Sequence, residues 1–445
     1  MTFNSEILLR RLAELSDIAG KPSRYVVALS GGLDSVVLTH ALATSREEHG
    51  TPVIAVHIDH GLHDDSAAWS RACADFAATV GIELDSRRVD VERDTGRGLE
   101  AAAREARYAA LEDCIESGDW LLSAHHQDDQ AETLLLNLVR GSGPAGLAGI
   151  GAVRRFAGGW LVRPLLGISR HALQEYATAS GLRWTDDPSN TDQKFDRNYL
   201  RHEIMTRLEA RWPDVAVRLS RSAQLAGEAS ELLDELAALD VTTLGERFDR
   251  LAIDGLRAMS VERQRNLLRY AARKLGLPIP TAVQLQHVVE QVIAARDDAQ
   301  PLVRWPGAEI RRFRNQLYLL RAGKSATPDD TGRAITGEYL VLDAGLGVLH
   351  LQANASTGLS DAIVKRGLEL RYRCGGEKFR PYGQSHTRKL KKLLQEEGVV
   401  PWMRDRIPLV YAGGKLVAAA DLWIAADAAS EPGTAIHWSN RPAIH

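Results

Sequence analysis

Short apolar runs alternate with helical patterns along the first third of the chain, and this alternation restricts the fold more than any other feature. Strand-length runs rich in β-branched or large apolar residues occupy residues 25–29, 52–58 and 120–124, and a more polar one falls within 82–91. Helical patterns fill the intervals, at residues 34–43, 67–80, 100–117 and 128–139. Repeated β–α units of this length predict a parallel, doubly wound α/β sheet with helices on both faces.

The 445 residues are too many for one ordinary core, so about two or three domains are expected. A glycine-rich stretch at residues 141–151 ends the β–α units, and two short helical patterns complete a first domain, residues 1–213. A long helical pattern at 214–240 then opens a mainly helical middle domain, residues 214–321, which closes with a hairpin pattern.

The segment 322–337 is small, polar and rich in turn residues, which is typical of a linker. The last domain, residues 336–445, combines short strands, a basic helix near 388–397 and a hairpin turn at Gly413-Gly414. This combination predicts a small α+β C-terminal domain.

Composition excludes several classes of protein. A net charge of −3 gives no overall field that attracts nucleic acid, so an RNA-binding surface has to be local. Cys73, Cys114 and Cys374 include no close pair, which argues against a disulfide framework and a CxxC metal site. Residues 1–15 carry charges within their apolar stretch, and no run reaches the roughly 18 apolar residues of a membrane span. We therefore expect a reduced cytoplasmic protein without a membrane partner.

The first strand runs directly into a hexapeptide that opens a helix and reads Ser30-Gly31-Gly32-Leu33-Asp34-Ser35. Its glycines let backbone N–H groups approach an anion, and the helix N-terminus adds the positive end of its dipole. No Gly-Lys-Ser/Thr follows, so the loop is not a Walker A motif. A carboxylate beside phosphates requires a cation between them, and we infer Mg²⁺ bound by Asp34.

An SGG turn by itself is commonly a tight strand-to-helix connection, but this one stands where open α/β sheets bind ligands. The hexapeptide resembles the pyrophosphate loop of the N-type ATP pyrophosphatase (PP-loop) superfamily, whose signature is SGGxDS. The resemblance implies that residues 30–35 bind ATP. It also implies that ATP is split into AMP and pyrophosphate to activate a carbonyl-type oxygen of a second molecule.

Further segments narrow the resemblance. They read HIDHGL at residues 57–62, EAAAREARY at 100–108, HHQDDQAET at 125–133, RPLL at 163–166 and DPSNTDQKFDRNYLR at 187–201. In this order they are similar to the tRNA(Ile)-lysidine synthetase family, and residues 372–409 resemble that family's last domain. The resemblance implies a ligase that adenylates C2 of the wobble cytidine in the CAU anticodon of an isoleucine tRNA. L-lysine then displaces AMP, and the tRNA reads AUA instead of AUG.

Two groups of residues are candidates for the chemistry. Arg104 and Arg107 share one helix face, where pairing with glutamates explains an isolated RxxR as well as a phosphate contact does. The resemblance favours a catalytic role for Arg104. His125 begins a run of two histidines and three carboxylates, more acids than pairing with a helix dipole explains. We expect His125, Asp129 and Glu132 to contact the substrate amine or Mg²⁺, and favour a zinc site less because thiolates are absent.

Arg197 and Arg201 fall on one helical surface, after a turn formed by Asp187 and Asn190. The residues alone describe a capped, exposed helix, whereas the resemblance makes both arginines candidates for tRNA contact. His63 is assigned no role.

Eight basic residues and a single acid lie between residues 371 and 392. A leucine stripe on the predicted helix leaves the basic side chains outside its core face. A lysine-rich helix face is commonly plain solvent exposure, but in a chain of net charge −3 this excess is the best candidate for phosphate contacts. The predicted tRNA contacts here are Arg380, Arg388, Lys391 and Lys392.

Two alternatives stay open. An ATP-dependent tRNA thiolase of the same superfamily also adenylates a base, but it usually needs a cysteine pair or an iron–sulfur site, for which these cysteines are scattered. A non-catalytic RNA-binding protein would carry a damaged ATP loop, whereas SGGxDS is intact.

Overall fold

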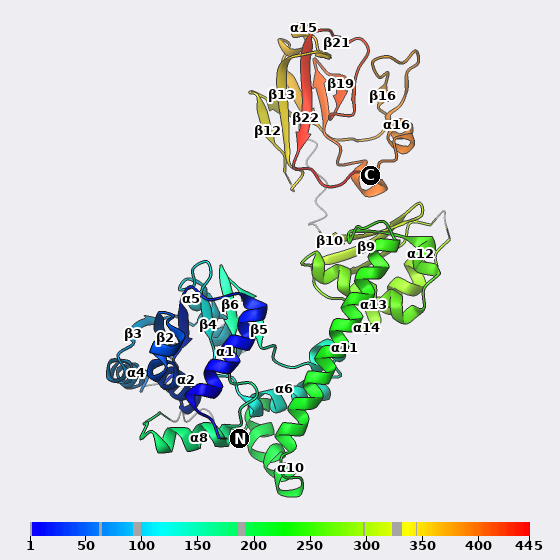
Figure 1. The fold of residues 1–445 in the computed structure, drawn as a ribbon. Helices are drawn as coiled ribbons and strands as arrows, with labels where there is room; N and C mark the ends of the chain where they lie inside the picture. Colours follow the sequence, from blue (N-terminus) through cyan, green and yellow to red (C-terminus); the bar gives the residue numbers. More distant parts are fainter. Residues whose placement is uncertain are drawn as a thin grey trace. The chain divides into compact units, whose positions relative to one another are not determined.

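The computed structural model describes residues 2–61, 65–91, 99–185, 192–296, 299–322, 332–343 and 345–445. The chain divides into two compact units, Met1–Leu233 and Asp234–His445 (Figure 1). Most of the predicted linker, residues 323–331, lies outside the described residues, as do His63, Asp187 and Asn190. No helix among the described ranges is both long and apolar enough to cross a membrane.

The first unit is built on a six-stranded sheet with the order β3-β2-β1-β4-β6-β5. Its strands are β1 (Tyr25–Ala28), β2 (Val53–Asp59), β3 (Glu83–Arg88), β4 (Trp120–Leu122), β5 (Val153–Phe156) and β6 (Gly159–Val162). All neighbouring strands are parallel except β5 and β6. The predicted doubly wound, mainly parallel sheet is therefore confirmed.

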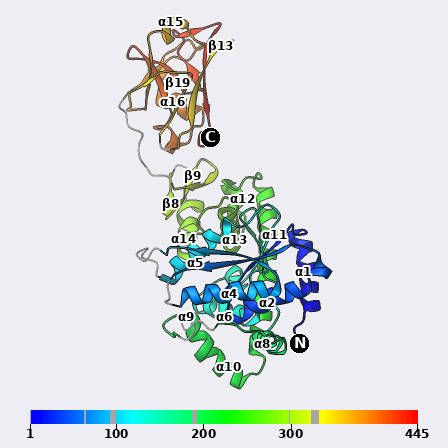
Figure 2. The ribbon, with the colours of Figure 1, turned by 90° about the vertical axis from the view of Figure 1, so that its left-hand side faces the viewer.

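Both faces of this sheet are buried, which explains why β1 reads as a continuous apolar run. The adjacent residues Val26 and Val27 belong to different core clusters, because successive side chains of a strand point to opposite faces. Figure 2 shows the sheet from its edge, with α5 on one side and α2 and α4 on the other. The helices that build these layers are α1 (Ser5–Ala19), α2 (Leu33–Thr44), α4 (Ser66–Val80), α5 (Leu99–Glu112) and α8 (Arg170–Ala179).

Strand order reverses at the boundary between β1 and β4. The chain passes from β1 outward to β2 and β3, then returns to the other side of β1 to form β4 and β6. Such a switch point opens a crevice at the carboxyl ends of the two strands. The residues that follow β1 and β4 are the predicted ATP loop and the run that begins at His125, so the topology brings the two predicted groups together.

The remaining helices of the first unit follow the sheet. They are α3 (Arg46–His49), α6 (Gln127–Val139), α7 (Pro144–Leu147), α9 (Asp196–Tyr199), the π-helical η2 (Leu200–Met205) and α10 (Thr206–Arg211). The long helix α11 (Val215–Thr243) begins in the first unit and continues into the second.

The second unit begins with a helical region that also carries a sheet. The helices are α12 (Ile253–Arg257), α13 (Val261–Lys274), α14 (Ala282–His287) and the π-helical η3 (Val288–Ile293). Four strands pair in the order β7-β10-β9-β8: β7 (Arg250–Ala252), β8 (Leu302–Trp305), β9 (Ala308–Phe313) and β10 (Gln316–Arg321). The predicted hairpin is β9–β10. The other two strands were not predicted, because three and four residues show no period of their own.

The C-terminal region is rich in strands and forms two five-stranded sheets around one core. One sheet has the order β11-β15-β18-β19-β20, with strands β11 (Arg333–Ile335), β15 (Leu368–Arg371), β18 (Leu409–Ala412), β19 (Lys415–Ala419) and β20 (Trp423–Ile424). The other has the order β12-β13-β22-β14-β21, with strands β12 (Tyr339–Val341), β13 (Val348–Ala355), β14 (Gly358–Leu359), β21 (Ala429–Ser430) and β22 (Gly433–Ser439).

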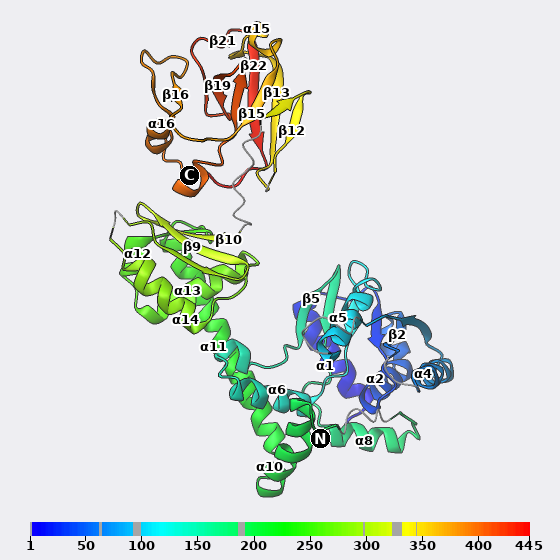
Figure 3. The ribbon, with the colours of Figure 1, turned by 180° about the vertical axis from the view of Figure 1, so that it is seen from behind.

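The predicted hairpin turn joins β18 and β19. Gly413 and Gly414 both have positive φ, 55° and 77°, as a two-residue type I′ turn requires. Beside the sheets lie a two-stranded hairpin and short helices (Figure 3). These are β16 (Lys378–Phe379), β17 (Arg388–Lys389), α15 (Asp361–Val364), α16 (Leu390–Glu396) and the 3₁₀ turn η4 (Pro401–Met403).

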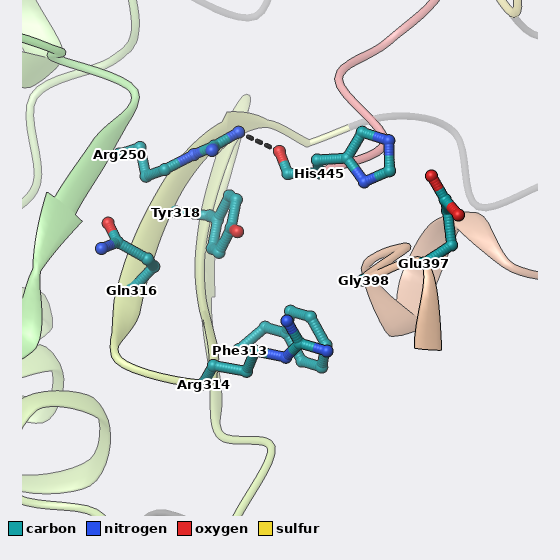
Figure 4. A pocket seen from close by; sticks show the side chains of 8 residues that line it. All are labelled: Arg250, Phe313, Arg314, Gln316, Tyr318, Glu397, Gly398 and His445. Carbon is teal, nitrogen blue, oxygen red and sulfur yellow. Dashed lines mark hydrogen bonds between the residues drawn. The ribbon is translucent and has the colours of Figure 1, made fainter. Parts of the chain in front are cut away.

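A pocket in the second unit is lined by residues of the middle sheet and of the C-terminal region (Figure 4). Arg250 donates a hydrogen bond to the backbone carbonyl of His445 across it. The pocket contains none of the predicted site residues.

Candidate active site

The loop between β1 and α2 presents backbone donors at the switch point. Gly31 has φ of +84°, and a Cβ on it would stand 3.0 Å from Cys73 Sγ, so the position requires glycine. Gly32 is the N-cap of α2 and makes no side-chain capping bond, which leaves the first N–H groups of the helix for an anion. Ser30 Oγ and Ser35 Oγ lie 3.1 Å apart, and Ser35 Oγ donates to the Gly32 carbonyl at 3.0 Å.

Neighbouring elements hold this loop in place. The Gly31 carbonyl accepts from Thr185 N–H at 2.9 Å, which ties the loop to the chain after α8. The buried His57 of β2 donates from Nδ1 to the Leu29 carbonyl at 2.9 Å, and its Nε2 lies 3.1 Å from Ser70 Oγ. The loop is thus preorganised, so binding an anion requires little rearrangement.

His126 is the centre of a carboxylate cluster at the carboxyl end of β4. Its Nε2 lies 3.6 Å from Asp34 Oδ2 and 3.5 Å from Asp129 Oδ2, while its Nδ1 lies 3.5 Å from Asp128 Oδ2. Burial opposes the charged imidazolium, but the carboxylates of Asp128, Asp34 and Asp129 outweigh burial and raise the pKa of His126 to about 10. His126 is therefore a cation at neutral pH, and it joins the loop to α6.

Asp34 keeps one oxygen without a protein partner. Its Oδ2 faces His126, whereas its Oδ1 is buried and accepts no hydrogen bond. A buried carboxylate oxygen without a partner is unfavourable, and a divalent cation is a suitable partner for it. In the described parts of the chain, no group of three or more His, Cys, Asp or Glu side chains is arranged to hold a metal by itself. A cation at Asp34 would therefore complete its coordination with oxygens of the substrate or of water.

His125 has a lowered pKa, whereas the pKa of its neighbour His126 is raised. Its Nδ1 lies 2.6 Å from Ser123 Oγ. Burial, reinforced by Arg163, Arg197 and Arg107, lowers the pKa of His125 to about 4 despite the nearby Asp129. His125 is consequently neutral at pH 7, with a ring nitrogen available to accept a proton or a hydrogen bond.

Asp129 and Glu132 hold the two arginines that were predicted to face tRNA. Glu132 is 2% exposed, and its two oxygens accept from Arg201 Nε at 2.6 Å and Arg197 Nε at 3.0 Å. Asp129 Oδ1 accepts from Arg197 Nη2 at 2.8 Å. Both arginines share one surface, as predicted, but that surface faces α6. These ion pairs fix α9 and η2 against the helix that carries the carboxylates.

Arg104 of α5 lies over the ring of Tyr108. Its side chain is exposed, and its guanidinium carbon is 5.1 Å from the centroid of the Tyr108 ring. The structure therefore places Arg104 beside Tyr108, together with Arg107 of the same helix.

In the C-terminal region the leucine stripe is buried as predicted, at Leu390, Leu393 and Leu394. Arg380, Lys391 and Lys392 are exposed. The prediction placed Arg388 on the helix, and this is wrong: α16 begins at Leu390. Arg388 lies in β17, where pairing with β16 keeps the backbone extended, and its side chain is paired with Glu396.

The β16–β17 hairpin adds a feature that composition does not reveal. Lys378 and Lys389 are directly opposite each other in the antiparallel pair, and both are exposed. Like charges in this register destabilise a hairpin, and a bound phosphate would relieve the repulsion. Lys389 therefore joins Lys391 and Lys392 as a candidate phosphate contact.

The sequence placed His126 and Asp128 in the same run as the predicted catalytic residues, but it did not select them or Arg163 as site residues. It selected His125 from an adjacent pair of histidines, because spacing does not show which of two neighbours faces the carboxylates where a strand ends. One available signal is that Asp34 and the histidine pair follow strands that a doubly wound sheet places side by side.

Comparisons with known proteins match most of the length of the chain. Residues 4–208 match a family model described as a PP-loop domain, residues 251–318 a TilS substrate binding domain, and residues 368–438 a TilS substrate C-terminal domain. A tRNA(Ile)-lysidine synthase of Alkalilimnicola ehrlichii is 41% identical over 96% of this chain and 95% of its own. One of Xanthomonas campestris is 43% identical over 92% of each chain.

Among solved structures, a U34-tRNA thiolase of Methanococcus maripaludis is a distant likeness. It is 20% identical, covers 50% of this chain and 79% of its own, and has a TM-score of 0.41.

The loop geometry predicts the effect of Gly31→Ala. The new Cβ would stand 3.0 Å from Cys73 Sγ. The alanine would also have to keep a positive φ, which costs an L residue about 1–2 kcal/mol. We expect ATP to bind at least about tenfold more weakly, as measured by titration calorimetry.

Two further variants separate the causes. Gly31→Ala with Cys73→Ala removes the contact but not the φ strain, so part of the affinity should return. The control is Gly50→Ala. Gly50 also has a positive φ, +62°, but nothing lies within 4 Å of an added Cβ, so the affinity for ATP should not change. Wild-type affinity in Gly31→Ala would show that the loop does not contact ATP.

Proposed function

This chain belongs to the tRNA(Ile)-lysidine synthase family, and we propose that it joins L-lysine to C2 of the wobble cytidine of the isoleucine tRNA with a CAU anticodon. Each turnover converts ATP to AMP and pyrophosphate, and the modified tRNA reads AUA instead of AUG. The observation that carries this proposal is the intact loop beside the Asp34–His126 cluster, in a chain that matches its relatives over almost their whole length.

The first step activates the base. The C2 oxygen of cytidine attacks the α-phosphorus of ATP, the bond from that phosphorus to the bridging oxygen breaks, and pyrophosphate leaves. Residues 30–35 and the N-terminus of α2 are suited to hold the departing phosphates, because they offer N–H and hydroxyl donors at a helix start. His126 adds a fixed positive charge behind the Asp34 carboxylate.

The residues fit the Mg²⁺ inferred from the sequence. Asp34 would hold the ion through its unpaired Oδ1, and the ion supplies charge neutralisation between the carboxylate and the phosphate oxygens. His126 restrains the other Asp34 oxygen, so the carboxylate has a defined direction before any ligand binds.

The second step forms the carbon–nitrogen bond. The lysine amine attacks C2, the C2–O bond breaks, AMP leaves with the oxygen, and the nitrogen loses a proton. His125 is the neutral imidazole of the site and is the proposed acceptor of that proton. Its pKa is low partly because of Arg107, Arg163 and Arg197, and an anionic substrate beside these cations would raise it toward the range of an effective base.

Asp129 and Glu132 are both occupied in this structure. A lysine ammonium would reach them only by displacing Arg197 or Arg201, which carry the same charge. We therefore assign Glu132 a positioning role, in which it fixes both arginines against α6. Asp129 contacts His126 through one oxygen and Arg197 through the other, so it links this brace to the catalytic cluster.

A thiolase is not favoured. Burial raises the pKa of the Cys73 thiol to about 11, and Cys73 packs in a core cluster with α2 and α4. Cys114 is buried in a different cluster, with α5 on the opposite face of the sheet. Two thiols on opposite faces of one sheet do not form a redox pair.

The function is tested by mass analysis of the CAU-anticodon isoleucine tRNA incubated with the protein, ATP and lysine. We expect a mass gain of one lysine less water, with AMP and pyrophosphate as the other products. Asp34→Asn should lower this activity by about two orders of magnitude or more, because the phosphate charge loses its partner.

Asp75→Asn is the matched control for that variant. It removes the same charge from the same unit at an exposed position of α4, and it should keep wild-type activity. A sulfur-sized mass gain would select a thiolase, and release of ADP would place the chain in another class of enzyme.

The C-terminal patch gives a second prediction. We expect the triple change of Lys389, Lys391 and Lys392 to Gln to flatten the log–log salt dependence of tRNA binding by about 2–3 units. Each phosphate that a lysine no longer neutralises lowers the slope by about 0.7–0.9. The control is Arg388→Gln, whose charge is already held by Glu396 and which should leave the slope nearly unchanged. An unchanged slope in the triple variant would show that these lysines face only solvent.

A further inference from the structure

Four arginines gather around Tyr108 on the side of the sheet covered by α5. The guanidinium carbons of Arg104, Arg107 and Arg154 lie 5.1, 5.7 and 5.4 Å from the centroid of the Tyr108 ring. Arg163 approaches the Tyr108 hydroxyl. The ring itself is fixed by an edge-on contact with Phe156, at 5.8 Å between centroids. Two elements, α5 and the β5–β6 hairpin, thus supply one arginine cluster.

The groups that act most strongly on the two most buried arginines of the cluster, Arg107 and Arg163, are mainly other arginines. The titratable groups with the largest effect on the pKa of Arg107 are Tyr108, Arg104 and Arg197, and those with the largest effect on Arg163 are Tyr108, Arg154 and Arg104. Burial lowers the pKa of both arginines, and the neighbouring arginines lower it further. Arg163 is 6% exposed, and its Nε is buried without a hydrogen-bond partner. A bound anion would stabilise such an arrangement of like charges.

The cluster borders the active site. Arg163 follows β6 and His125 follows β4, and these strands are parallel neighbours, so both residues stand at the carboxyl edge of the sheet. Arg107 and Arg163 both act on His125, and Arg107 also acts on His60 at the end of β2. The ATP loop lies at the start of α2, on the other side of the sheet from α5.

We propose that this arginine cluster binds a phosphodiester of the substrate tRNA beside the nucleotide that is modified, with Arg107 and Arg163 as inner contacts and Arg104 and Arg154 at the exposed rim. The proposal deepens the function above and rests on tRNA being the substrate. Guanidinium groups match phosphate oxygens in paired hydrogen bonds, which position RNA without reading its sequence.

The number and exposure of the charges favour RNA over the other anions of the reaction. The phosphates of ATP already have donors in the loop and at the start of α2. The carboxylate of lysine is a single isolated charge, whereas RNA presents successive phosphodiesters that several guanidinium groups can contact together. Arg104 and Arg154 are exposed, so the cluster reaches solvent as a site for a polyanion has to.

Arg154→Gln tests the proposal against a matched control on the same strand. The next residue, Arg155, is also exposed, but its guanidinium carbon lies 3.8 Å from the centroid of the Trp160 ring and not over Tyr108. Both variants remove one positive charge from β5. We expect Arg154→Gln to weaken tRNA binding about tenfold and to lower the salt slope by about 0.7–0.9. Arg154→Lys should recover part of both, and Arg155→Gln should change neither.

Further measurements distinguish the anions. KM for ATP and KM for lysine should equal the wild-type values in Arg154→Gln. A raised KM for ATP with normal tRNA binding would assign the cluster to the nucleotide, and a raised KM for lysine would assign it to the lysine carboxylate. Equal losses in Arg154→Gln and Arg155→Gln would show only a general electrostatic field. Each of these results would overturn the proposal.

The binding assay needs no turnover, so it separates this proposal from the proposed reaction. A wild-type protein that binds the tRNA but adds no lysine would contradict the reaction, while the comparison of Arg154 with Arg155 would still decide the contact.

Discussion

Charge separation at the carboxyl edge of one parallel sheet is the constraint on which the active site depends. Asp34, Asp128 and Asp129 surround a charged His126, while arginines surround the neutral His125 and Tyr108. Two adjacent residues of one strand end thus have pKa values near 10 and near 4. The difference arises because each side chain faces a different set of charges, and not because the residues differ chemically. Adjacent titratable groups with opposite protonation states are typical of active sites in which one group acts as an acid and the other as a base.

Maintaining this separation requires rigid supports on both sides. Ion pairs of Asp129 and Glu132 with Arg197 and Arg201 fix the carboxylate side, and they cross from α6 to α9 and η2. The loop side is fixed by backbone bonds to Thr185 and by His57. Removing one partner of a buried ion pair leaves an uncompensated charge, which lowers the free energy of unfolding by about 3–5 kcal/mol. Arg197 and Arg201, which were predicted to contact RNA, therefore stabilise the carboxylate side of the site in the absence of RNA.

The sequence predicted the features of the fold that follow from the periodicity of apolar residues. It did not predict which side chains meet through tertiary contacts. Alternating β and α patterns predicted the parallel sheet, and its topology placed the loop beside the His125 run. Spacing did not show that His126 faces the carboxylates while His125 faces arginines, because the two side chains of adjacent residues point in different directions. It predicted that Arg197 and Arg201 share a surface, but not that the surface faces buried carboxylates. Arg388 was placed on a helix because its charge fits the pattern, whereas strand pairing with Phe379 keeps it extended.

The net charge of the chain gives these local clusters their significance. With a net charge of −3 there is no general attraction for RNA, so affinity has to come from a few contacts. The arginines around Tyr108 lie in the first unit and the lysines near α16 in the second. When two contact regions bind one molecule, the second contact becomes intramolecular and the affinities combine almost multiplicatively. An RNA that contacts only one of the two regions binds with the affinity of that region alone. A protein that needs both contacts can therefore reject RNAs of the wrong shape without reading most of their sequence.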